Sequence, residues 1–129
     1  MAQVKVYSSA DNIKRHRETL SAAIHSAIVS ALDYPVEKKF QRFMSLDAAD
    51  FIFPADRSLQ YVIIEISLFT GRSQEAKTAL IKALFVNIEQ ATGIDPQDIE
   101  ITLFETPVSN WGIRGLLASE LTLNYKVDV

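Results

Sequence analysis

With 129 residues and no cysteine, the chain carries a formal net charge of −3, and its residues are 48% hydrophobic and 22% charged. This length and composition fit one globular domain with a single core, which we take as residues 1–129. The lack of cysteine excludes disulfides and thiolate metal sites. The acidic balance argues against a generic nucleic-acid binder, because no basic surplus is present to release counterions from phosphates. Residues 1–5 contain no apolar run suited to a signal peptide and no segment reaches transmembrane length, so we expect a cytoplasmic protein without a membrane partner.

The first half of the chain predicts a strand, a helix and a second strand. Residues 4–7 form a short strand candidate. Over residues 13–32 apolar side chains recur at helical spacing, and either Ser9 or Asp11 is suited to cap the start of this helix. Residues 39–46 predict the second strand.

The second half predicts the same order of elements. Residues 61–69 are nearly continuously apolar, which is typical of a central strand that is covered on both faces. Ser73 is a suitable N-cap for a helix over residues 76–91, and Gly93 suits a left-handed cap at its end. The alternation over residues 99–104 predicts the next strand.

These two halves repeat one apolar pattern. When residues 4–44 are laid over residues 64–105, the apolar positions coincide at a shift of 60, which becomes 61 after the helix. The repeats therefore span about 2–46 and 61–105, and the remaining residues, 106–129, form a loop and a short strand. A repeat of this kind indicates a duplicated supersecondary unit.

The duplicated unit predicts the fold class α+β. Each β-α-β unit joins two parallel strands through one helix with a right-handed connection. We therefore expect two tandem units that form a four-stranded mixed sheet with two helices on one face, plus a short C-terminal strand where residues 121–127 alternate. Since two helices leave the other face of the sheet bare, we expect an oligomer in which bare faces pack together.

Arg72 stands between the first strand and the helix of the second unit, one residue before the expected cap. Free backbone N–H groups and the positive end of the helix dipole favour an anion at such a place, and a guanidinium adds a bidentate clamp for a carboxylate. The corresponding position of the first unit is Asn12, so only one unit carries the cation. A solvent-exposed turn arginine is the alternative interpretation.

Two further features, the basic strand and the single tryptophan, each admit two interpretations. Lys38, Lys39 and Arg42 make the second strand of the first unit basic, which either protects a sheet edge against aggregation or helps to hold an acidic ligand. Trp111, the only tryptophan, stands in a loop of turn-forming residues, where it either walls a pocket or fills a subunit contact. The two histidines lie in the first helix without partners at metal-ligand spacing, so we expect no metal site.

Two motifs of the sequence resemble those of a known family. Residues 71–73 read Gly-Arg-Ser, and residues 105–115 read Glu-Thr-Pro-x-x-x-Trp-Gly-Ile-x-Gly. The second motif is similar to the Glu-Met-Pro-x-x-x-Phe-Gly-Ile-x-Gly stretch of the small 4-oxalocrotonate tautomerases. Together with the duplicated β-α-β unit, these motifs make the whole chain resemble the tautomerase superfamily, with its tautomerase/MIF-like fold, and most of all its malonate semialdehyde decarboxylase branch.

The resemblance implies a homotrimer with a barrel-like centre and a site near the start of the first strand, working without a cofactor. In this family the initiator methionine is removed, and an N-terminal proline then moves protons between carbon and oxygen of a keto or enol acid. Arginines hold the substrate carboxylate, and an aromatic residue lines the pocket. Carried over by motif position, Arg72 binds a small carboxylate ligand, Trp111 forms the aromatic wall, and Lys39 is a second basic binding residue.

Position 2 departs from the family pattern, because Ala2 stands where the proline is expected. Once Met1 is removed, the α-amine of Ala2, whose reference pKa is about 7.7–8.0, can act as a weak base or form an imine with a carbonyl compound. The sequence therefore predicts a tautomerase-like isomerase, or a related decarboxylase-like activity, with Ala2 as the catalytic amine. The alternatives are a non-catalytic trimeric carboxylate-binding protein of the same fold, and a ferredoxin-like regulatory or interaction module with the same order of elements.

Overall fold

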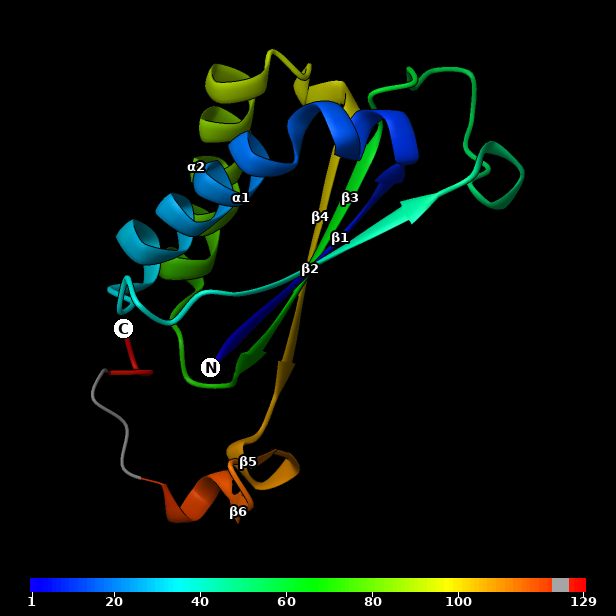
Figure 1. The fold of residues 1–129 in the computed structure, drawn as a ribbon. Helices are drawn as coiled ribbons and strands as arrows, with labels where there is room; N and C mark the ends of the chain where they lie inside the picture. Colours follow the sequence, from blue (N-terminus) through cyan, green and yellow to red (C-terminus); the bar gives the residue numbers. More distant parts are fainter. Residues whose placement is uncertain (122–125) are drawn as a thin grey trace.

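The computed structural model describes residues 1–121 and 126–129, which contain a four-stranded sheet and two long helices (Figure 1). The main elements follow in the order β1 (Ala2–Ser9), α1 (Ala10–Leu32), β2 (Phe40–Leu46), β3 (Val62–Phe69), α2 (Gln74–Thr92) and β4 (Ile99–Thr106). Two short strands, β5 (Gly112–Ile113) and β6 (Leu116–Leu117), then pair as a hairpin. Single-turn 3₁₀ helices lie in the connections at Ala48–Asp50, Pro96–Asp98, Val108–Asn110 and Ala118–Glu120. Among these described residues, no helix combines the length and the apolar character that spanning a membrane requires.

The strands lie in the order β2-β1-β3-β4. Within each unit the two strands are parallel, and the two units meet through the antiparallel pairing of β1 with β3. Both helices lie on the same side of the sheet (Figure 1). The predicted α+β fold, with its mixed four-stranded sheet, is confirmed. A split β-α-β arrangement of the ferredoxin-like kind would place another strand between β1 and β2, and the observed order excludes it.

The space between the sheet and the helices is filled by the apolar positions that the two units share. Alternate residues of a strand point to one face, whereas the buried residues of a helix recur every three or four positions. The residues concerned are Ala2, Val4 and Val6 of β1, Ile64, Ile66 and Leu68 of β3, Leu20, Ile24 and Ile28 of α1, and Leu80, Leu84 and Ile88 of α2, none of them more than 2% exposed. The buried helix residues of the two units coincide at the predicted shift of 60.

In the part of the chain that the structure describes, no helix covers the opposite face of the sheet, as the sequence predicts (Figure 1). This open face is more polar than the apolar run over residues 61–69 indicates. Glu65 and Ser67 alternate with the buried residues of β3 and lie half-buried on the open face, where Glu65 sits opposite Lys5 of β1. The face therefore combines apolar and charged side chains, so an oligomer that covers it has to pair charges as well as bury apolar area.

The two units differ where the first strand meets the helix. In the first unit α1 follows β1 directly, with Ser9 rather than Asp11 as its cap, and residues 10–13 form its first turn. At the equivalent positions of the second unit, residues 70–73 form a loop, and α2 begins only after its cap, Ser73. The same four positions are thus a helical turn in one unit and a loop in the other.

The C-terminal part contains an element that the sequence does not predict. The hairpin of β5 and β6 has strands of two residues, which are too short to show an alternating pattern. Its turn has positive φ angles at Arg114 (55°) and Gly115 (79°), as a two-residue type I′ turn requires. The strand expected over residues 121–127 falls largely on residues 122–125, which lie outside the described residues.

Substitutions at two positions of α2 should change the free energy of unfolding by very different amounts. Leu84 is fully buried, whereas Val86 is 50% exposed. Leu84→Ala should lower the free energy of unfolding by roughly 2–5 kcal/mol, because it removes apolar contacts and leaves a cavity. Val86→Ala should change it by less than about 0.5 kcal/mol. Urea unfolding followed by circular dichroism measures both, and equal losses would contradict the assignment of the buried helix face.

Candidate active site at the start of the first strand

One end of the sheet brings together the segments in which the sequence predicts site residues. Because β1 is parallel to β2 and antiparallel to β3, its start lies beside the start of β2 and the end of β3. The end of β4 lies there too, since β4 is parallel to β3. Figure 1 shows the N-terminus next to the connection from β3 to α2. Ala2, Arg72 and Trp111 therefore reach one end of the sheet from three separate segments.

Ala2 is the first residue of β1 and is almost completely buried, with 2% of its surface exposed. It lies opposite Leu68 in the antiparallel register with β3. Its backbone N–H donates a hydrogen bond of 3.1 Å to the hydroxyl oxygen of Tyr34, a buried residue in the connection between α1 and β2. The nitrogen of Ala2 is thus enclosed by protein and has a defined polar partner.

The α-amine of Met1 lies at this end of the sheet and has a strongly perturbed pKa. The pKa of the amine falls from 8.0 to about 5. Burial, which disfavours the charged ammonium form, is the main cause, and the positive charges of Arg72 and then of Lys38 lower the pKa further. At pH 7 only about one amine in a hundred is therefore protonated, so the group is a neutral base.

Arg72 is buried although it carries a charge, with 5% of its surface exposed. Its Nη1 donates a hydrogen bond of 3.3 Å to the carbonyl oxygen of Phe69. The loop before it depends on Gly71, whose φ of 134° is rarely adopted by residues with a side chain, and an added Cβ would lie 3.1 Å from Cγ1 of Val127. The burial of Arg72 argues against the alternative of a solvent-exposed turn arginine.

Three backbone N–H groups at the start of α2 already have partners within the protein. The N–H of Ser73 donates to the oxygen of Val129 over 2.7 Å. The N–H groups of Ala76 and Lys77 donate to the side chain and the carbonyl of Ser73, over 3.1 Å and 3.2 Å. An anion at this junction would therefore depend mainly on the guanidinium of Arg72 and less on free N–H groups.

Trp111 is half-buried and packs edge-on against Phe69 of β3, with ring centroids 5.0 Å apart and an interplanar angle of 83°. Its indole Nε1–H donates a hydrogen bond of 3.0 Å to Oγ1 of Thr106, which fixes the ring against the end of β4. The carbonyl of Phe69 also accepts the hydrogen bond from Arg72. One residue at the end of β3 thus contacts both the aromatic ring and the cation.

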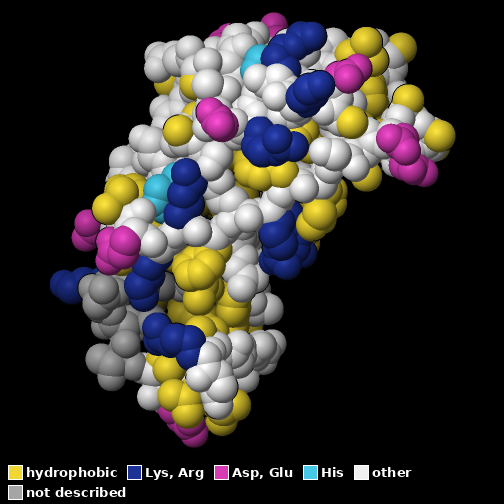
Figure 2. Space-filling model, in the orientation of Figure 1, with side chains coloured by type: hydrophobic (Ala, Val, Ile, Leu, Met, Phe, Trp, Pro, Cys, Tyr) yellow, Lys and Arg dark blue, Asp and Glu magenta, His cyan; other side chains and the backbone are white. Residues whose placement is uncertain are grey.

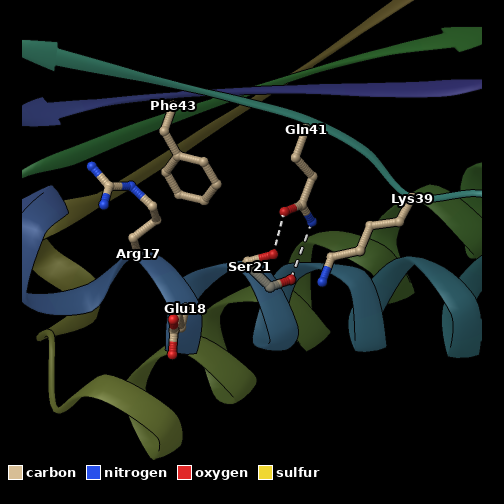
Figure 3. A pocket seen from close by; sticks show the side chains of 6 residues that line it. All are labelled: Arg17, Glu18, Ser21, Lys39, Gln41 and Phe43. Atoms are coloured by element: carbon tan, nitrogen blue, oxygen red, sulfur yellow. Dashed lines mark hydrogen bonds between the residues drawn. The ribbon is translucent and has the colours of Figure 1, made fainter.

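Lys39 lines a groove of about 440 Å³ between α1 and β2 (Figure 3). Gln41 spans this groove, because its Nε2 donates to the carbonyl of Ser21 over 3.1 Å and its Oε1 accepts from the Ser21 hydroxyl over 2.5 Å. The side chain of Lys39 extends toward α1 in the same view. The lysine whose charge acts on the terminal amine is Lys38. The role of Lys39 as a second carboxylate-binding residue stays a prediction.

Lys and Arg side chains are spread over one face of the molecule. Figure 2 shows Lys and Arg side chains along the middle of this view, among hydrophobic side chains, with Asp and Glu side chains nearer the margins. On β2, an edge strand of the sheet, Arg42 donates a hydrogen bond of 3.4 Å to Gln3 at an exposed position. The exposed position of Arg42 on this edge strand agrees with the interpretation that the basic strand protects a sheet edge from pairing with other chains.

Asn12, which matches Arg72 in the sequence repeat, has a structural role. It is buried, and its Nδ2 donates hydrogen bonds to Oγ of Ser8 over 2.9 Å and to the carbonyl of Gln60 over 3.0 Å. These bonds join the start of α1 to the chain that enters β3. No group of three or more His, Asp or Glu side chains suited to a metal ion occurs in the described part of the chain.

Tyr34 and Phe69 are site residues that the sequence does not single out. Both read as core aromatics, because Tyr34 follows the first helix and Phe69 ends an apolar strand. The place of Tyr34 in the sequence does indicate that it lies near the start of β1. α1 runs back along the sheet from the end of β1, so the residue after it, which precedes Pro35, has to lie near the start of β1.

Comparison with known proteins identifies the family. Residues 38–114 match the model of the Tautomerase enzyme family, and the chain belongs to this family. A stretch of 57 residues, 44% of the chain, is 33% identical to the 2-hydroxymuconate tautomerase of Comamonas testosteroni and covers 90% of that protein. The probable tautomerase YusQ of Bacillus subtilis is 22% identical over 99 residues, which cover 73% of this chain and 78% of YusQ.

Solved structures share the fold of this chain. The structure of malonate semialdehyde decarboxylase matches with a TM-score of 0.80 at 22% identity, over 93% of this chain and 99% of its own. Native fused 4-OT matches with a TM-score of 0.80 at 25% identity, over 92% of this chain and 98% of its own. The 2-hydroxymuconate tautomerase covers about half of the chain, as expected if it corresponds to one of the two units.

The burial of the terminal amine predicts an unusual titration. The terminal α-amine should have a pKa well below its usual 8.0, as that of Met1 has, and Arg72→Gln should raise it, because a positive charge that disfavours the ammonium is removed. Lys38→Gln should raise the pKa by less, and Arg114→Gln, in the exposed hairpin turn, should leave it unchanged. The pH dependence of acylation of the α-amine, followed by peptide mass spectrometry, measures these values. A pKa near 8 in the unmodified protein would contradict the site.

Proposed function

We propose that this protein binds a small keto or enol carboxylic acid and catalyses keto–enol tautomerisation with its N-terminal amine as the base. The observation that carries the proposal is the pKa of the Met1 amine, which burial and the charge of the buried Arg72 lower to about 5, and we expect the same causes to act on the amine that replaces it. Proton transfer on a carboxylic acid requires such a base together with a cation that holds the carboxylate. Membership of the tautomerase family supports the reaction class.

The amine that we assign to catalysis is that of Ala2, exposed by removal of Met1. Alanine is small enough to be compatible with removal of the preceding methionine. The new α-amine would be the nitrogen that now contacts Tyr34, one residue further into the protein. We expect its pKa to be lowered by the causes that act on the Met1 amine, which are burial first and then the charges of Arg72 and Lys38.

The reaction needs two proton transfers and no cofactor. From enol to ketone, the neutral amine takes the proton of the 2-hydroxyl group, which leaves an enolate. As the C2–O bond then becomes a carbonyl, the electrons of the C2–C3 double bond take a proton at C3 from the ammonium, which returns the amine to its neutral form. A low pKa makes this ammonium a strong acid, so it gives up the proton readily. Atoms and charge balance, and the product is an isomer of the substrate.

Arg72 has two tasks in this proposal. Its guanidinium binds the substrate carboxylate through charge-assisted hydrogen bonds. In the free protein its charge helps to keep the amine neutral, and when a carboxylate offsets that charge the pKa of the amine rises and the amine becomes a stronger base. Trp111, held by Thr106 and Phe69, forms the aromatic wall of the site. Lys39 is retained as a candidate for a second contact with the ligand.

In a second candidate function, the protein binds the same ligand at this site but catalyses no reaction. This candidate is favoured by Ala2, because a primary amine lacks the ring that fixes the direction of an N-terminal proline. Arg72 and Trp111 would then serve a carboxylate-binding protein that performs no reaction. Both candidates predict the same ligand, so binding and catalysis have to be measured separately.

We further propose that the protein acts as a cytoplasmic homotrimer. The open face of its sheet and the two edge strands, β2 and β4, are surfaces that association can cover. A fused 4-OT described as a symmetric trimer matches the fold with a TM-score of 0.77 at 24% identity, over 91% of this chain and 96% of its own, and supports the proposal.

Removal of the guanidinium should weaken ligand binding. Arg72→Ala should raise the dissociation constant of a small keto or enol acid roughly 10- to 100-fold, the loss expected for hydrogen bonds to a charged group. Arg114→Ala removes an equal charge from the exposed hairpin turn and should leave binding unchanged. Calorimetric titration measures both, and the absence of binding by the unmodified protein would remove the site hypothesis.

Restoring the proline of the family separates the two candidate functions. With phenylenolpyruvate as the enol acid, the unmodified protein should ketonise the substrate, and Ala2→Pro should be faster because a ring fixes the direction of the amine. The decay of the enol absorbance measures the rate, with the double variant Ala2→Pro/Arg72→Ala as the control. Ketonisation by Ala2→Pro alone would support the non-catalytic candidate, and no ketonisation by either protein would refute a tautomerase site.

A further inference from the structure

A buried tyrosine hydroxyl contacts the nitrogen at the start of β1, and the mechanism above does not use it. The hydroxyl oxygen of Tyr34 accepts the N–H of Ala2 over 3.1 Å. Tyr34 is 3% exposed and Ala2 is 2% exposed, so water competes little for this contact. A hydrogen bond is strengthened by the low dielectric of such a place.

The backbone that carries Tyr34 is fixed by the end of α1. The C-cap, Asp33, has a left-handed conformation with φ of 49°, and its N–H donates to the carbonyl of Val29. The N–H of Tyr34 donates to the same carbonyl over 3.2 Å. Pro35 follows and restricts Tyr34 to an extended backbone. Since a tyrosine has only two side-chain torsions, burial then leaves its hydroxyl in a well-defined position.

The contact lies where the pairing of β1 with β2 has not yet begun. That pairing starts at Gln3, opposite Phe40, whereas Ala2 is placed by Leu68 on the β3 side. Tyr34 belongs to the segment that leads into β2, so it supplies a polar partner on that side of Ala2. The nitrogen is therefore held between β3 and the end of the first helix.

We propose that Tyr34 is a positioning residue that orients the Ala2 amine for proton transfer, an inference that rests on the proposed function. The amine of a terminal alanine rotates about its Cα–N bond, whereas the nitrogen of a terminal proline is fixed in a ring. One N–H directed at Tyr34 stops this rotation and sets the direction of the nitrogen lone pair. Tyr34 thus supplies the constraint that Ala2 lacks.

A purely structural role for the hydroxyl makes different predictions. If Tyr34 only satisfies a buried N–H group, loss of the hydroxyl lowers stability but has the same effect on turnover whichever residue stands at position 2. The charged groups that act on the Met1 amine, Arg72 and Lys38, are both retained when the hydroxyl is removed. A change in the pKa of the amine therefore reports the hydrogen bond itself. Because the oxygen accepts the N–H, it favours the ammonium, so its loss should lower the pKa.

A double-mutant cycle between Tyr34→Phe and Ala2→Pro tests the proposal. With alanine at position 2, Tyr34→Phe should lower kcat for phenylenolpyruvate about tenfold with little change in KM, as expected when orientation is lost and ligand binding is kept. With proline at position 2, the same change should cost less than about twofold. Tyr7→Phe removes a hydroxyl from the open face of the sheet and serves as the control.

The titration of the amine gives a readout that does not require turnover. Acylation of the α-amine as a function of pH should show a lower pKa in Tyr34→Phe than in the unmodified protein, with Tyr7→Phe unchanged. Equal losses of kcat in the two backgrounds, or an unchanged amine pKa, would overturn the role of Tyr34. If the unmodified protein binds the acid but shows no ketonisation, the catalytic proposal fails, and the pKa readout still decides whether Tyr34 holds the amine. Tyr34→Met, which also lacks the hydroxyl, replaces Tyr34→Phe if that variant does not fold.

Discussion

The antiparallel pairing of β1 with β3 is the contact on which the candidate site depends. Its register places Ala2 opposite Leu68, immediately before the segment that carries Arg72. A slip of one residue would turn Val4 and Val6 from the helices to the open face, so burial of the core fixes the register. The same burial encloses the nitrogen of Ala2 at the start of β1 and lowers the pKa of the neighbouring Met1 amine. The core therefore determines where the terminal amine lies and favours its neutral form.

The two copies of the duplicated unit differ where the first strand meets the helix, and only the second copy carries a guanidinium there. Residues 10–13 continue directly from β1 as the first turn of α1, and in that turn Asn12 ties the helix to the neighbouring chain. Residues 70–73 form a loop at the same place, because Gly71 adopts a positive φ and α2 starts later. The loop carries Arg72 to the end of β3, where its charge acts on the amine. A difference of one helical turn thus separates a structural junction from a candidate binding site.

Much of the fold follows from the sequence, because the signals are local and repeated. The strands and helices of the two units, the caps at Ser9, Ser73 and Gly93, and the single covered face of the sheet agree with the structure. Local sequence signals do not predict the contact between Tyr34 and Ala2. This contact joins residues 32 positions apart and depends on how α1 returns across the sheet. The short hairpin of β5 and β6 has no alternating pattern to detect. For the site, motif positions indicate Arg72 and Trp111, but the neutral state of the amine depends on burial and charge in three dimensions.

The central claim is that a neutral Ala2 amine beside Arg72 performs the proton transfer. Acylation at about pH 6, where lysine side chains are protonated and a terminal amine of lowered pKa is not, should modify that amine selectively. Intact mass and the rate of phenylenolpyruvate ketonisation are then measured on the same samples. We expect a protein that lacks Met1, a single modification at Ala2, and a loss of rate that matches the modified fraction. A terminus that retains Met1, or complete modification of Ala2 with an unchanged rate, would contradict it.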